Sequence, residues 1–200
     1  ELKEIAELAC ENSLSGFEFA AGIPGSLGGA LYMNAGAYGG EMKDVIVSAE
    51  FVNQNGELIE LDKSELKLEY RTSILQKEDP DWIAVNVTIE LKKEKKRIIK
   101  AKMDELHQKR WSKQPMELPS AGSIFKRPPG HYTGPLIEDA GLKGFQIGGA
   151  QVSIKHAGFI VNRGNATAED IVNLISKIKE EVYKISGVQL EVEPRFLGDF

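Results

Sequence analysis

The residues best suited to chemistry fall in four short segments, and the first is rich in glycine. It reads Gly22-Ile23-Pro24-Gly25-Ser26-Leu27-Gly28-Gly29-Ala30 and is followed by Met33-Asn34-Ala35-Gly36-Ala37-Tyr38-Gly39. Glycine lets a ligand approach main-chain N–H groups directly, and consecutive amides in such turns bind anions. The segment lacks the Gly-Lys-Ser/Thr of a P-loop and the leading strand of a Rossmann fingerprint. Composition alone leaves a tight structural loop and a ligand-binding loop equally open.

The second and third segments place an arginine and a serine where a ligand can reach them. Arg71 stands in Tyr70-Arg71-Thr72-Ser73 and carries a planar fork of donors that suits a carboxylate or a phosphate. An isolated arginine is more often a surface ion-pair partner. Ser123 lies in the bend formed by residues 119–128, without the Gly-x-Ser-x-Gly pattern of a hydrolase. A serine in such a bend usually bonds its own backbone.

The fourth segment, residues 190–196, carries two carboxylates. Glu191 and Glu193 are two residues apart on an expected strand and would face the same side of it. Paired carboxylates beside Arg195 suit proton transfer, and the same pattern also describes an exposed strand face.

The remaining reactive side chains indicate neither a metal site nor a disulfide. The histidines, His107, His131 and His156, do not have the spacing of metal ligands. We expect His107 on an exposed helix face, and His156, just before an apolar strand, within reach of a pocket. Cys10 is the only cysteine, which excludes an internal disulfide and fits the reducing cytoplasm. We expect it to be a small buried helix residue.

Charge and composition exclude two further classes of protein. The formal net charge of −5 and the pI of about 5.4 argue against a nucleic-acid-binding protein. No stretch approaches the roughly 20 apolar residues of a membrane span, so we expect no membrane insertion. The lysine-rich run 92–102 is interpreted as a solvated helix start, because apolar residues continue after it at helical spacing.

Strands and helices alternate without a regular βαβ rhythm, which predicts an α+β fold. The first ten residues predict a helix with Ile5, Leu8 and Ala9 on one side, and the small residues of 13–40 predict loops and short turns. Strands are expected at 46–53 and 57–61 around Asn55-Gly56, at 83–91, and at 188–197. Helices are expected near 98–110, from Pro135 to about 141–144, and from Thr167 to Ile185.

In this order, the segments resemble the UDP-N-acetylenolpyruvoylglucosamine reductase (MurB) family of peptidoglycan synthesis. The matching motifs are the glycine-rich segment, Tyr-Arg-Thr-Ser at 70–73, Ser-Ala-Gly-Ser-Ile-Phe-Lys at 120–126, the stretch 141–149, His-Ala-Gly-Phe at 156–159, and Leu-Glu-Val-Glu-Pro-Arg-Phe-Leu-Gly at 190–198. The resemblance covers essentially the whole chain. The short segment between Leu91 and Ser123 resembles the compact, type II form of the family.

The resemblance implies an FAD-dependent oxidoreductase with a two-step reaction. NADPH reduces FAD, and the flavin then delivers hydride to the enolpyruvyl double bond of a UDP-sugar, giving UDP-N-acetylmuramate. By position, Arg71 and Glu193 match residues placed at the substrate carboxylate, and Ser123 matches the general acid. Glu193 should hold or share a proton in order to assist an anion. We infer that the neighbouring cations Lys126 and Arg195 bias the serine proton.

The resemblance also implies the residues that bind the cofactor and the substrate. Those expected to bind FAD are Ile23, Pro24, Gly25, Ser26, Gly28, Gly29, Asn34, Ala35, Gly36 and Arg195. Those expected to bind the UDP-sugar are Tyr70, Lys113, Lys126, Lys143 and His156. Arg127 stands where some relatives have an asparagine that contacts the substrate.

Two domains are expected. Residues 1–110, joined by residues 188–200, should form the second lobe of an FAD-binding domain, and residues 111–187 a smaller α+β substrate-binding domain. We expect the first flavin-binding lobe of the family to be absent from this chain, so that it binds FAD weakly or not at all. The alternative to the reductase is therefore a flavin-free, inactive fragment that binds the UDP-sugar.

Overall fold

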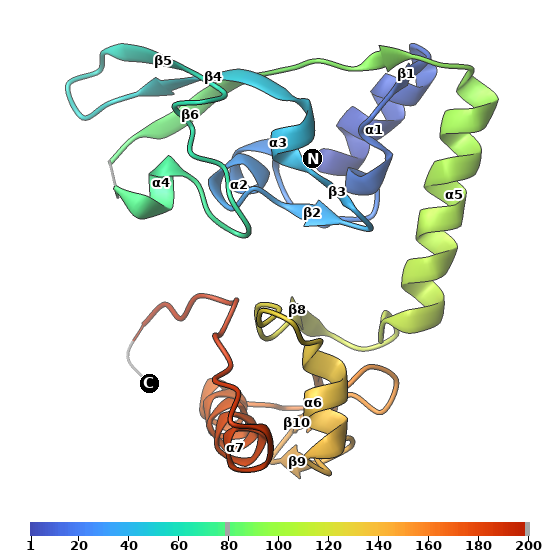
Figure 1. The fold of residues 1–200 in the computed structure, drawn as a ribbon, viewed down its shortest axis with the longest axis vertical. Helices are drawn as coiled ribbons and strands as arrows, with labels where there is room; N and C mark the ends of the chain where they lie inside the picture. Colours follow the sequence, from blue (N-terminus) through green and yellow to red (C-terminus); the bar gives the residue numbers. More distant parts are fainter. Residues whose placement is uncertain (79–80, 199–200) are drawn as a thin grey trace. The chain divides into compact units, whose positions relative to one another are not determined.

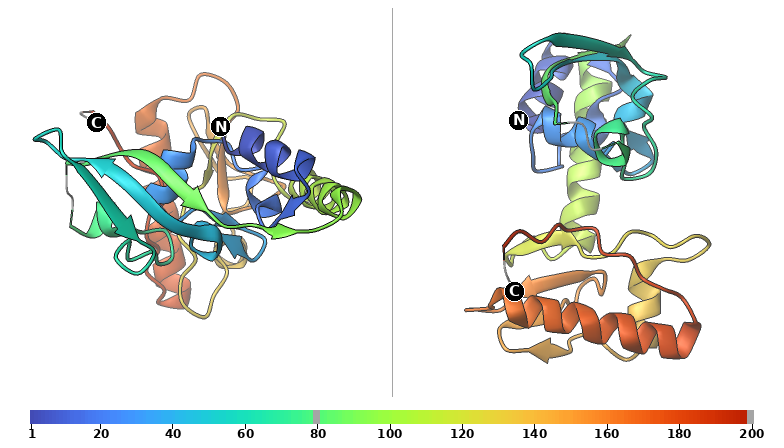
Figure 2. Two further views of the ribbon diagram at one scale, coloured as in Figure 1. Left: turned by 90° about the horizontal axis from the view of Figure 1, so that it is seen from above. Right: turned by 90° about the vertical axis from the view of Figure 1, so that its left-hand side faces the viewer.

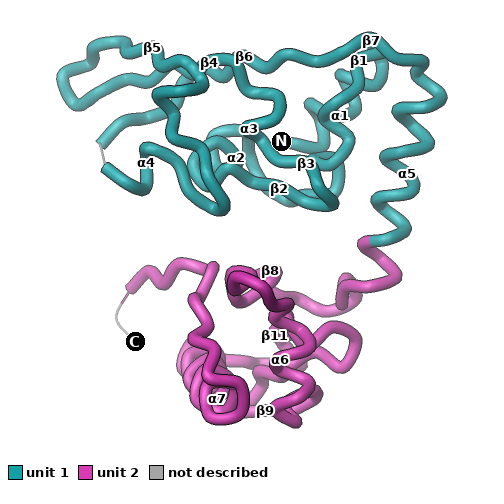
Figure 3. The backbone as a smooth tube through the Cα atoms, viewed as in Figure 1, with its two compact units in different colours: residues 1–109 teal, residues 110–200 magenta. Residues whose placement is uncertain are grey.

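The computed structural model describes residues 1–78 and 81–198, and it divides the chain into two compact units. Unit 1 is Glu1–Lys109 and unit 2 is Arg110–Phe200 (Figure 3). The boundary falls inside the long helix α5 (Lys96–Lys113), close to the position expected from the sequence. The two units have separate hydrophobic cores.

Unit 1 combines a small sheet with several short helices (Figure 1). Before α5, its elements are α1 (Leu2–Glu11), β1 (Leu14–Ser15), η1 (Glu18–Ala20), α2 (Leu27–Tyr32), β2 (Gly36–Ala37), β3 (Gly40–Glu41), α3 (Met42–Val45), β4 (Ile46–Val52), β5 (Leu58–Asp62), α4 (Ile74–Lys77), β6 (Ile83–Ile89) and β7 (Lys92–Lys93). β1 pairs with β7, and β2 pairs with β3, each pair antiparallel.

The hairpin predicted around Asn55-Gly56 is confirmed. β4 and β5 pair antiparallel from Ser48 opposite Asp62 to Val52 opposite Leu58, and Gly56 adopts the positive φ of 80° that such a turn requires. β6 pairs with the other edge of β4, giving the strand order β5-β4-β6. The inward face of the central strand carries Phe51, which is fully buried and packs on Trp82 with 5.7 Å between ring centroids.

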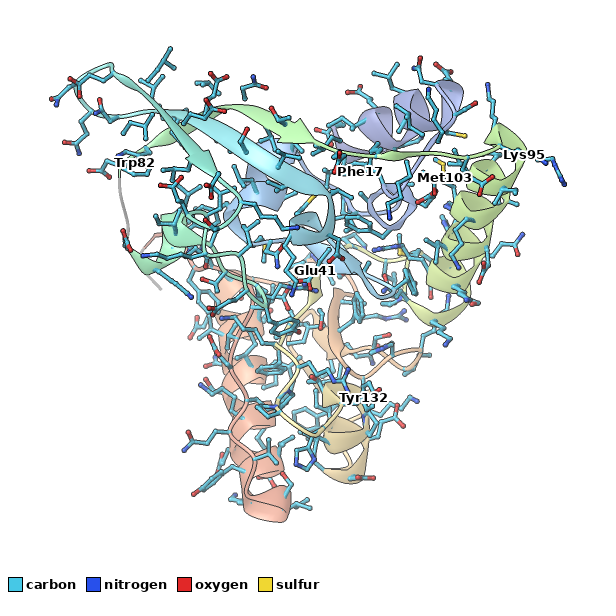
Figure 4. All side chains as sticks on the ribbon, turned by 45° about the horizontal axis from the view of Figure 1, so that its top comes forward. Phe17, Glu41, Trp82, Lys95, Met103 and Tyr132 are labelled. Carbon is cyan, nitrogen blue, oxygen red and sulfur yellow. The ribbon has the colours of Figure 1, made fainter. Side chains whose placement is uncertain are left out.

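The N-terminal helix α1 is confirmed, and of the three residues predicted on its apolar side, Ala9 is buried, Ile5 packs against the core and only Leu8 was predicted wrongly. Leu2, Ala6, Ala9 and Cys10 face the core, whereas Leu8 is 60% exposed. The buried positions follow the spacing i, i+4, i+7 and i+8, which is an equally regular helical stripe. The core that receives this face includes Phe17 and Met103 (Figure 4).

The glycine-rich segment contains a short helix that its composition did not predict. Helix α2 begins after Ser26, whose side-chain oxygen accepts a hydrogen bond from the Gly29 N–H at 3.2 Å. Such a cap offsets part of the low helix propensity of glycine. Ala30 and Leu31 of this helix are buried and anchor it in the core of unit 1.

Unit 2 is a four-stranded antiparallel sheet with two helices. Its elements after α5 are β8 (Ser120–Ser123), α6 (Thr133–Asp139), β9 (Gln146–Ile147), β10 (Ala150–Val152), β11 (Phe159–Asn162) and α7 (Ala168–Ser186), and the strand order is β8-β11-β10-β9. Helix α7 is confirmed with both predicted ends. Thr167 caps it by accepting from the Asp170 N–H at 3.0 Å, and Gly187 ends it with a φ of 70°. Its buried stripe packs in the core of the unit. Figure 2 shows the course of this helix, in orange to red, beside the strands of unit 2.

The segment after α7 differs from the expected strand. It makes a single isolated bridge, Val192 opposite Phe125, flanked by the Lys126 N–H to Glu191 O and Glu193 N–H to Ile124 O bonds, both 2.9 Å long. These bonds attach residues 188–198 to the end of β8, so the segment belongs to unit 2 and not, as we expected, to the first domain.

Among the described residues, no helix is long and apolar enough to cross a bilayer.

Candidate active site

The predicted cofactor segment of unit 1 presents bare backbone. Gly25 has a φ of 146°, and a Cβ built on Gly25 or Gly28 would meet no atom within 4 Å. Pro24, Gly25 and Ser26 are exposed, and Gly28 is half-buried. A planar ring or a pyrophosphate can therefore reach the main chain without a side chain in the way. These residues fit one side of a dinucleotide cofactor such as FAD.

Arg71 sits in a tight turn next to this segment. Glu69 and Thr72 exchange both backbone hydrogen bonds, at 3.1 and 3.2 Å, so that Tyr70 and Arg71 form the tip between them. Arg71 has a φ of 56°, a left-handed conformation that is uncommon for a residue with a long side chain. Its Nη2 donates to the carbonyl oxygen of Gly36 at 3.2 Å, and its guanidinium lies 5.0 Å from the centre of the Tyr70 ring.

Ser123 and Glu193 lie on neighbouring segments of unit 2. Ser123 ends β8 opposite Phe159 of β11, and its hydroxyl donates to the Phe125 carbonyl oxygen at 3.3 Å. The N–H of Glu193 bonds Ile124, the residue that follows Ser123. Ser123 and Glu193 thus lie two residues and one residue, respectively, from the bridge between Phe125 and Val192. Lys126 forms an ion pair with the Glu191 carboxylate, so its charge is already balanced within the unit.

His156 occupies a restricted place beside Ser123. Its Nδ1 accepts the Gly158 N–H at 3.1 Å, which leaves Nε2 to carry the proton of the neutral ring. A Cβ built on Gly158 would lie 3.0 Å from His156 Cε1 and 3.9 Å from the Ser123 Oγ. The imidazole and the hydroxyl therefore border the same small space. The imidazole also packs edge-on against the Phe159 ring, with 5.1 Å between centroids.

The charges around His156 connect it with two predicted substrate residues. Burial lowers the pKa of His156, and the positive charges of Lys143 and Lys113 lower it further, while Glu138 opposes them. Lys143 pairs with Glu138 at 2.8 Å. Unit 2 thus brings together a neutral imidazole donor and two lysines, a set that suits the oxygens of a diphosphate.

Known proteins are similar to this chain along nearly its whole length. The family model described as the UDP-N-acetylenolpyruvoylglucosamine reductase C-terminal domain matches residues 114–197, and one described as an FAD binding domain matches residues 2–62. The reductase of that name from Listeria innocua is 54% identical over 199 residues, which are 100% of this chain and 66% of the relative. The one from Caldanaerobacter subterraneus is 53% identical over 198 residues, 99% of this chain and 65% of the relative.

A solved structure is also similar to this chain. The crystal structure of the reductase from Thermus caldophilus is 36% identical, covers 96% of this chain with a TM-score of 0.84, and is itself covered to 68%. The chain belongs to the UDP-N-acetylenolpyruvoylglucosamine reductase family. It spans about two thirds, 66%, of the length of the first curated relatives.

The two family models match different units of the chain. The matched FAD-binding range lies in unit 1, and the matched C-terminal domain lies in unit 2 and includes residues 188–197. Arg71 falls between the two matched ranges. Tyr70, which neighbours it, is 49% exposed, and Arg195 and Lys113 are exposed as well.

Two of the predicted cofactor residues have other reasons for their identity. The Asn34 side chain is completely buried, and its amide bonds only other groups of unit 1. Its side chain therefore has no exposed surface in this structure, and the predicted contact of Asn34 with FAD stays a prediction. A Cβ on Gly36 would lie 2.6 Å from Glu41 Cβ and 2.7 Å from Gly40 O, so the close β2–β3 pairing is enough to require glycine there. Ala35 is half-buried and packs against the core.

Sequence reasoning missed the polar residues behind Arg71. Ser73 is fully buried and donates to the Tyr32 carbonyl oxygen at 2.7 Å. Gln76 donates to the same oxygen at 2.8 Å and to the Arg71 carbonyl at 3.2 Å. Ser73 was part of the Tyr-Arg-Thr-Ser motif, but nothing in the sequence indicated a role for it. Within the described ranges, no group of three or more His, Cys, Asp or Glu side chains is placed to hold a metal ion.

Proposed function

We propose that the protein carrying this chain reduces the enolpyruvyl group of UDP-N-acetylglucosamine enolpyruvate to give UDP-N-acetylmuramate, with NADPH as reductant and FAD as cofactor. The observation that carries the proposal is the 54% identity to a reductase of that name along the full chain. The bridge between Phe125 and Val192 supports it, because it holds the chain at Glu193 beside the end of β8, where Ser123 lies. When bound, FAD supplies the hydride that it has taken from NADPH.

In this proposal, the exposed backbone of unit 1 binds the flavin. The candidate residues are Ile23, Pro24, Gly25, Ser26, Gly28 and Gly29. Their open glycine faces admit the cofactor to main-chain donors. Arg195, on unit 2, is proposed as a further cofactor contact from the family resemblance.

Arg71 and Glu193 are proposed to hold the substrate carboxylate as it gains negative charge. The guanidinium offers two parallel N–H groups to a carboxylate, and its anchor on the Gly36 carbonyl orients it before substrate arrives. Donors placed in advance where charge develops lower a barrier more than donors that must reorient. Glu193 assists only in the protonated form, because an ionised carboxylate would repel the anion.

Ser123 is proposed to donate the proton that completes the reduction. Its hydroxyl hydrogen is directed at the Phe125 carbonyl at 3.3 Å, a long and easily exchanged bond. The substrate carbon can therefore replace that acceptor. Lys113, Lys143 and His156 are proposed to bind the diphosphate and uridine end, with Tyr70 and Lys126 as further substrate contacts. The protein is proposed to act in the cytoplasm, where UDP-sugars and NADPH are available; its one cysteine, Cys10, is buried and reduced.

A single variant tests the proton donor. In the complete protein, Ser123→Ala should leave the reduction of flavin by NADPH intact and slow the oxidation of reduced flavin by the UDP-sugar by roughly 100-fold or more. Stopped-flow absorbance of the flavin band separates the two steps. Ser120→Ala, at the other end of β8, is the matched control and should behave like the parent. Normal oxidation of reduced flavin in the Ser123 variant would refute the assignment.

A further inference from the structure

Few polar side chains of the described chain are fully buried, and two of these lie around the Arg71 turn. The buried polar residues are Asn34 at 0%, Ser73 at 0%, Thr133 at 8% and Ser153 at 2% exposed. Burying an amide or a hydroxyl costs free energy unless its hydrogen bonds are made. The Asn34 side chain bonds Glu69, two residues before Arg71. Ser73 lies two residues after Arg71 and bonds the Tyr32 carbonyl oxygen.

Asn34 holds the first residue of the turn. Its Nδ2 donates to the Glu69 carbonyl oxygen at 2.9 Å and to Glu41 Oε2 at 2.7 Å. Its Oδ1 accepts the Lys43 N–H at 2.8 Å. Asn34 has a φ of 43°, a conformation that asparagine tolerates better than most residues. One side chain therefore joins the glycine-rich segment, helix α3 and the Arg71 turn.

Glu41 fixes the direction of the Asn34 amide. Its other carboxylate oxygen pairs with Lys43 at 2.7 Å, and its N–H bonds the Asp44 carboxylate at 2.9 Å at the start of α3. An ionised carboxylate is an acceptor only. The Asn34 NH₂ must therefore face Glu41, which directs its second hydrogen at the Glu69 carbonyl.

The other end of the turn is held from the same stretch of chain. Ser73 and Gln76 both donate to the Tyr32 carbonyl, two residues before Asn34. Gln76 also donates to the carbonyl of Arg71 itself. The turn is thus attached to residues 32–34 on both sides of its tip. These hydrogen bonds on both sides of the tip hold Arg71 in its left-handed conformation, which costs roughly 1–3 kcal/mol for a residue other than glycine.

We propose that Asn34 is a positioning residue, which sets the Arg71 guanidinium against the glycine-rich segment through the Glu69 carbonyl, with Ser73 as its counterpart on the far side of the turn. This inference rests on the proposed function, in which Arg71 meets the substrate carboxylate. It gives Asn34 a task that is separate from direct contact with FAD.

Amide hydrogen exchange tests the attachment without any turnover. Asn34→Gly keeps the left-handed backbone and removes all three side-chain bonds. The Glu69 and Thr72 amides, which bond each other's carbonyls, should exchange at least 10-fold faster in this variant. Exchange as slow as in the parent would overturn the proposal. Should Asn34→Gly not fold, Ser73→Ala decides by the same readout, because it removes only the second attachment.

Kinetics of the complete protein test the coupling to Arg71. Asn34→Gly should lower kcat by about 100-fold with a smaller change in KM, as expected for a displacement of about 1 Å. In an Arg71→Ala background, Asn34→Gly should cause no further loss, whereas an additive loss would overturn the proposal.

A matched control and an independent arm keep the outcomes distinct. Ser186→Ala removes a hydroxyl that bonds the Val182 carbonyl oxygen at the end of α7, and it should leave the kinetics of the Arg71→Ala background unchanged. If the parent protein shows no turnover with the UDP-sugar, the proposed function has failed, and the exchange measurement alone then decides whether Asn34 holds the turn.

Discussion

Gly149 is the position at which a single methyl group should damage unit 2 most. It lies between β9 and β10 against the turn that leads into α7. A Cβ at this position would lie 2.4 Å from the Ala166 nitrogen and 2.4 Å from the Gly164 carbonyl oxygen. Both are backbone atoms, which cannot rotate away as the end of a side chain can.

The size of the effect follows from what must move. Overpacking of this kind costs about 1–3 kcal/mol. Moving the backbone at Gly149 away from residues 164–166 also weakens two hydrogen bonds. These are the bond of the Gly149 N–H to Asp170 Oδ2, at 3.1 Å, and the bond of the Arg163 N–H to the Gly149 carbonyl oxygen, at 2.8 Å. A bond to a charged group contributes about 1.5–3 kcal/mol. Gly149→Ala should therefore lower the free energy of unfolding of unit 2 by about 3–5 kcal/mol.

Urea unfolding followed by circular dichroism measures this difference. The matched control is Gly134→Ala in α6, where the nearest atom, His156 Cε1, is 3.5 Å from the added Cβ, an ordinary contact. That change should be neutral or stabilising by up to about 1 kcal/mol, because alanine favours a helix over glycine. Equal stabilities of the two alanine variants would refute the reasoning from backbone proximity.

Two further predictions concern charged and titrating groups of the site. Arg71→Lys should lower kcat/KM by roughly 100-fold in the complete protein while the spectrum of bound flavin is retained, because an ammonium cannot reproduce the bidentate fork. Steady-state assays at saturating NADPH measure this loss. Retained activity would mean that the positive charge alone is sufficient. Burial lowers the pKa of His156, so the unfolded chain takes up its proton more readily than the folded one. The stability that the neutral ring contributes is complete above the ordinary histidine pKa of about 6.5 and is lost as the pH falls below it. His156→Gln should flatten the fall in melting temperature below about pH 6.5, and identical pH profiles for parent and variant would contradict the shift.

The sequence predicted the elements that depend on local signals. Helix α7 has a cap at Thr167, a long apolar stripe and a stop at Gly187, and each of these acts within a few residues. The hairpin at Asn55-Gly56 is equally local, since its turn residues sit beside the strands that they join. In both cases the signals lie within or next to the element that they determine, so a single sequence is enough to predict it.

Elements that depend on distant partners were not predictable in the same way. The pattern of α1 allows two adjacent apolar stripes, and only the core of unit 1 selects the one that leaves Leu8 in solvent. The segment around Glu193 has strand composition, but its single bridge to Phe125 crosses more than 60 residues of sequence. The pattern of residues 188–197 contains nothing that identifies β8 as the partner.

The candidate site shows the same division. The residue types in the glycine-rich segment, at Arg71 and at Ser123 were sufficient to select them as candidates. The task of Asn34 was not predictable, because its partners Glu41, Lys43 and Glu69 are brought to it by the fold. An asparagine that binds a ligand and an asparagine that holds a neighbouring loop can stand in the same sequence motif.

The left-handed backbone of Arg71 has a consequence for how this family can be engineered. A procedure that selects residues for stability would replace Arg71 early, since glycine or asparagine adopts a φ of 56° with less strain. The protein obtained would fold at least as well and would have lost the guanidinium. Improvement of stability and retention of chemistry therefore oppose each other at this position, and a stabilised variant of the family should keep residue 71 fixed while its surroundings change.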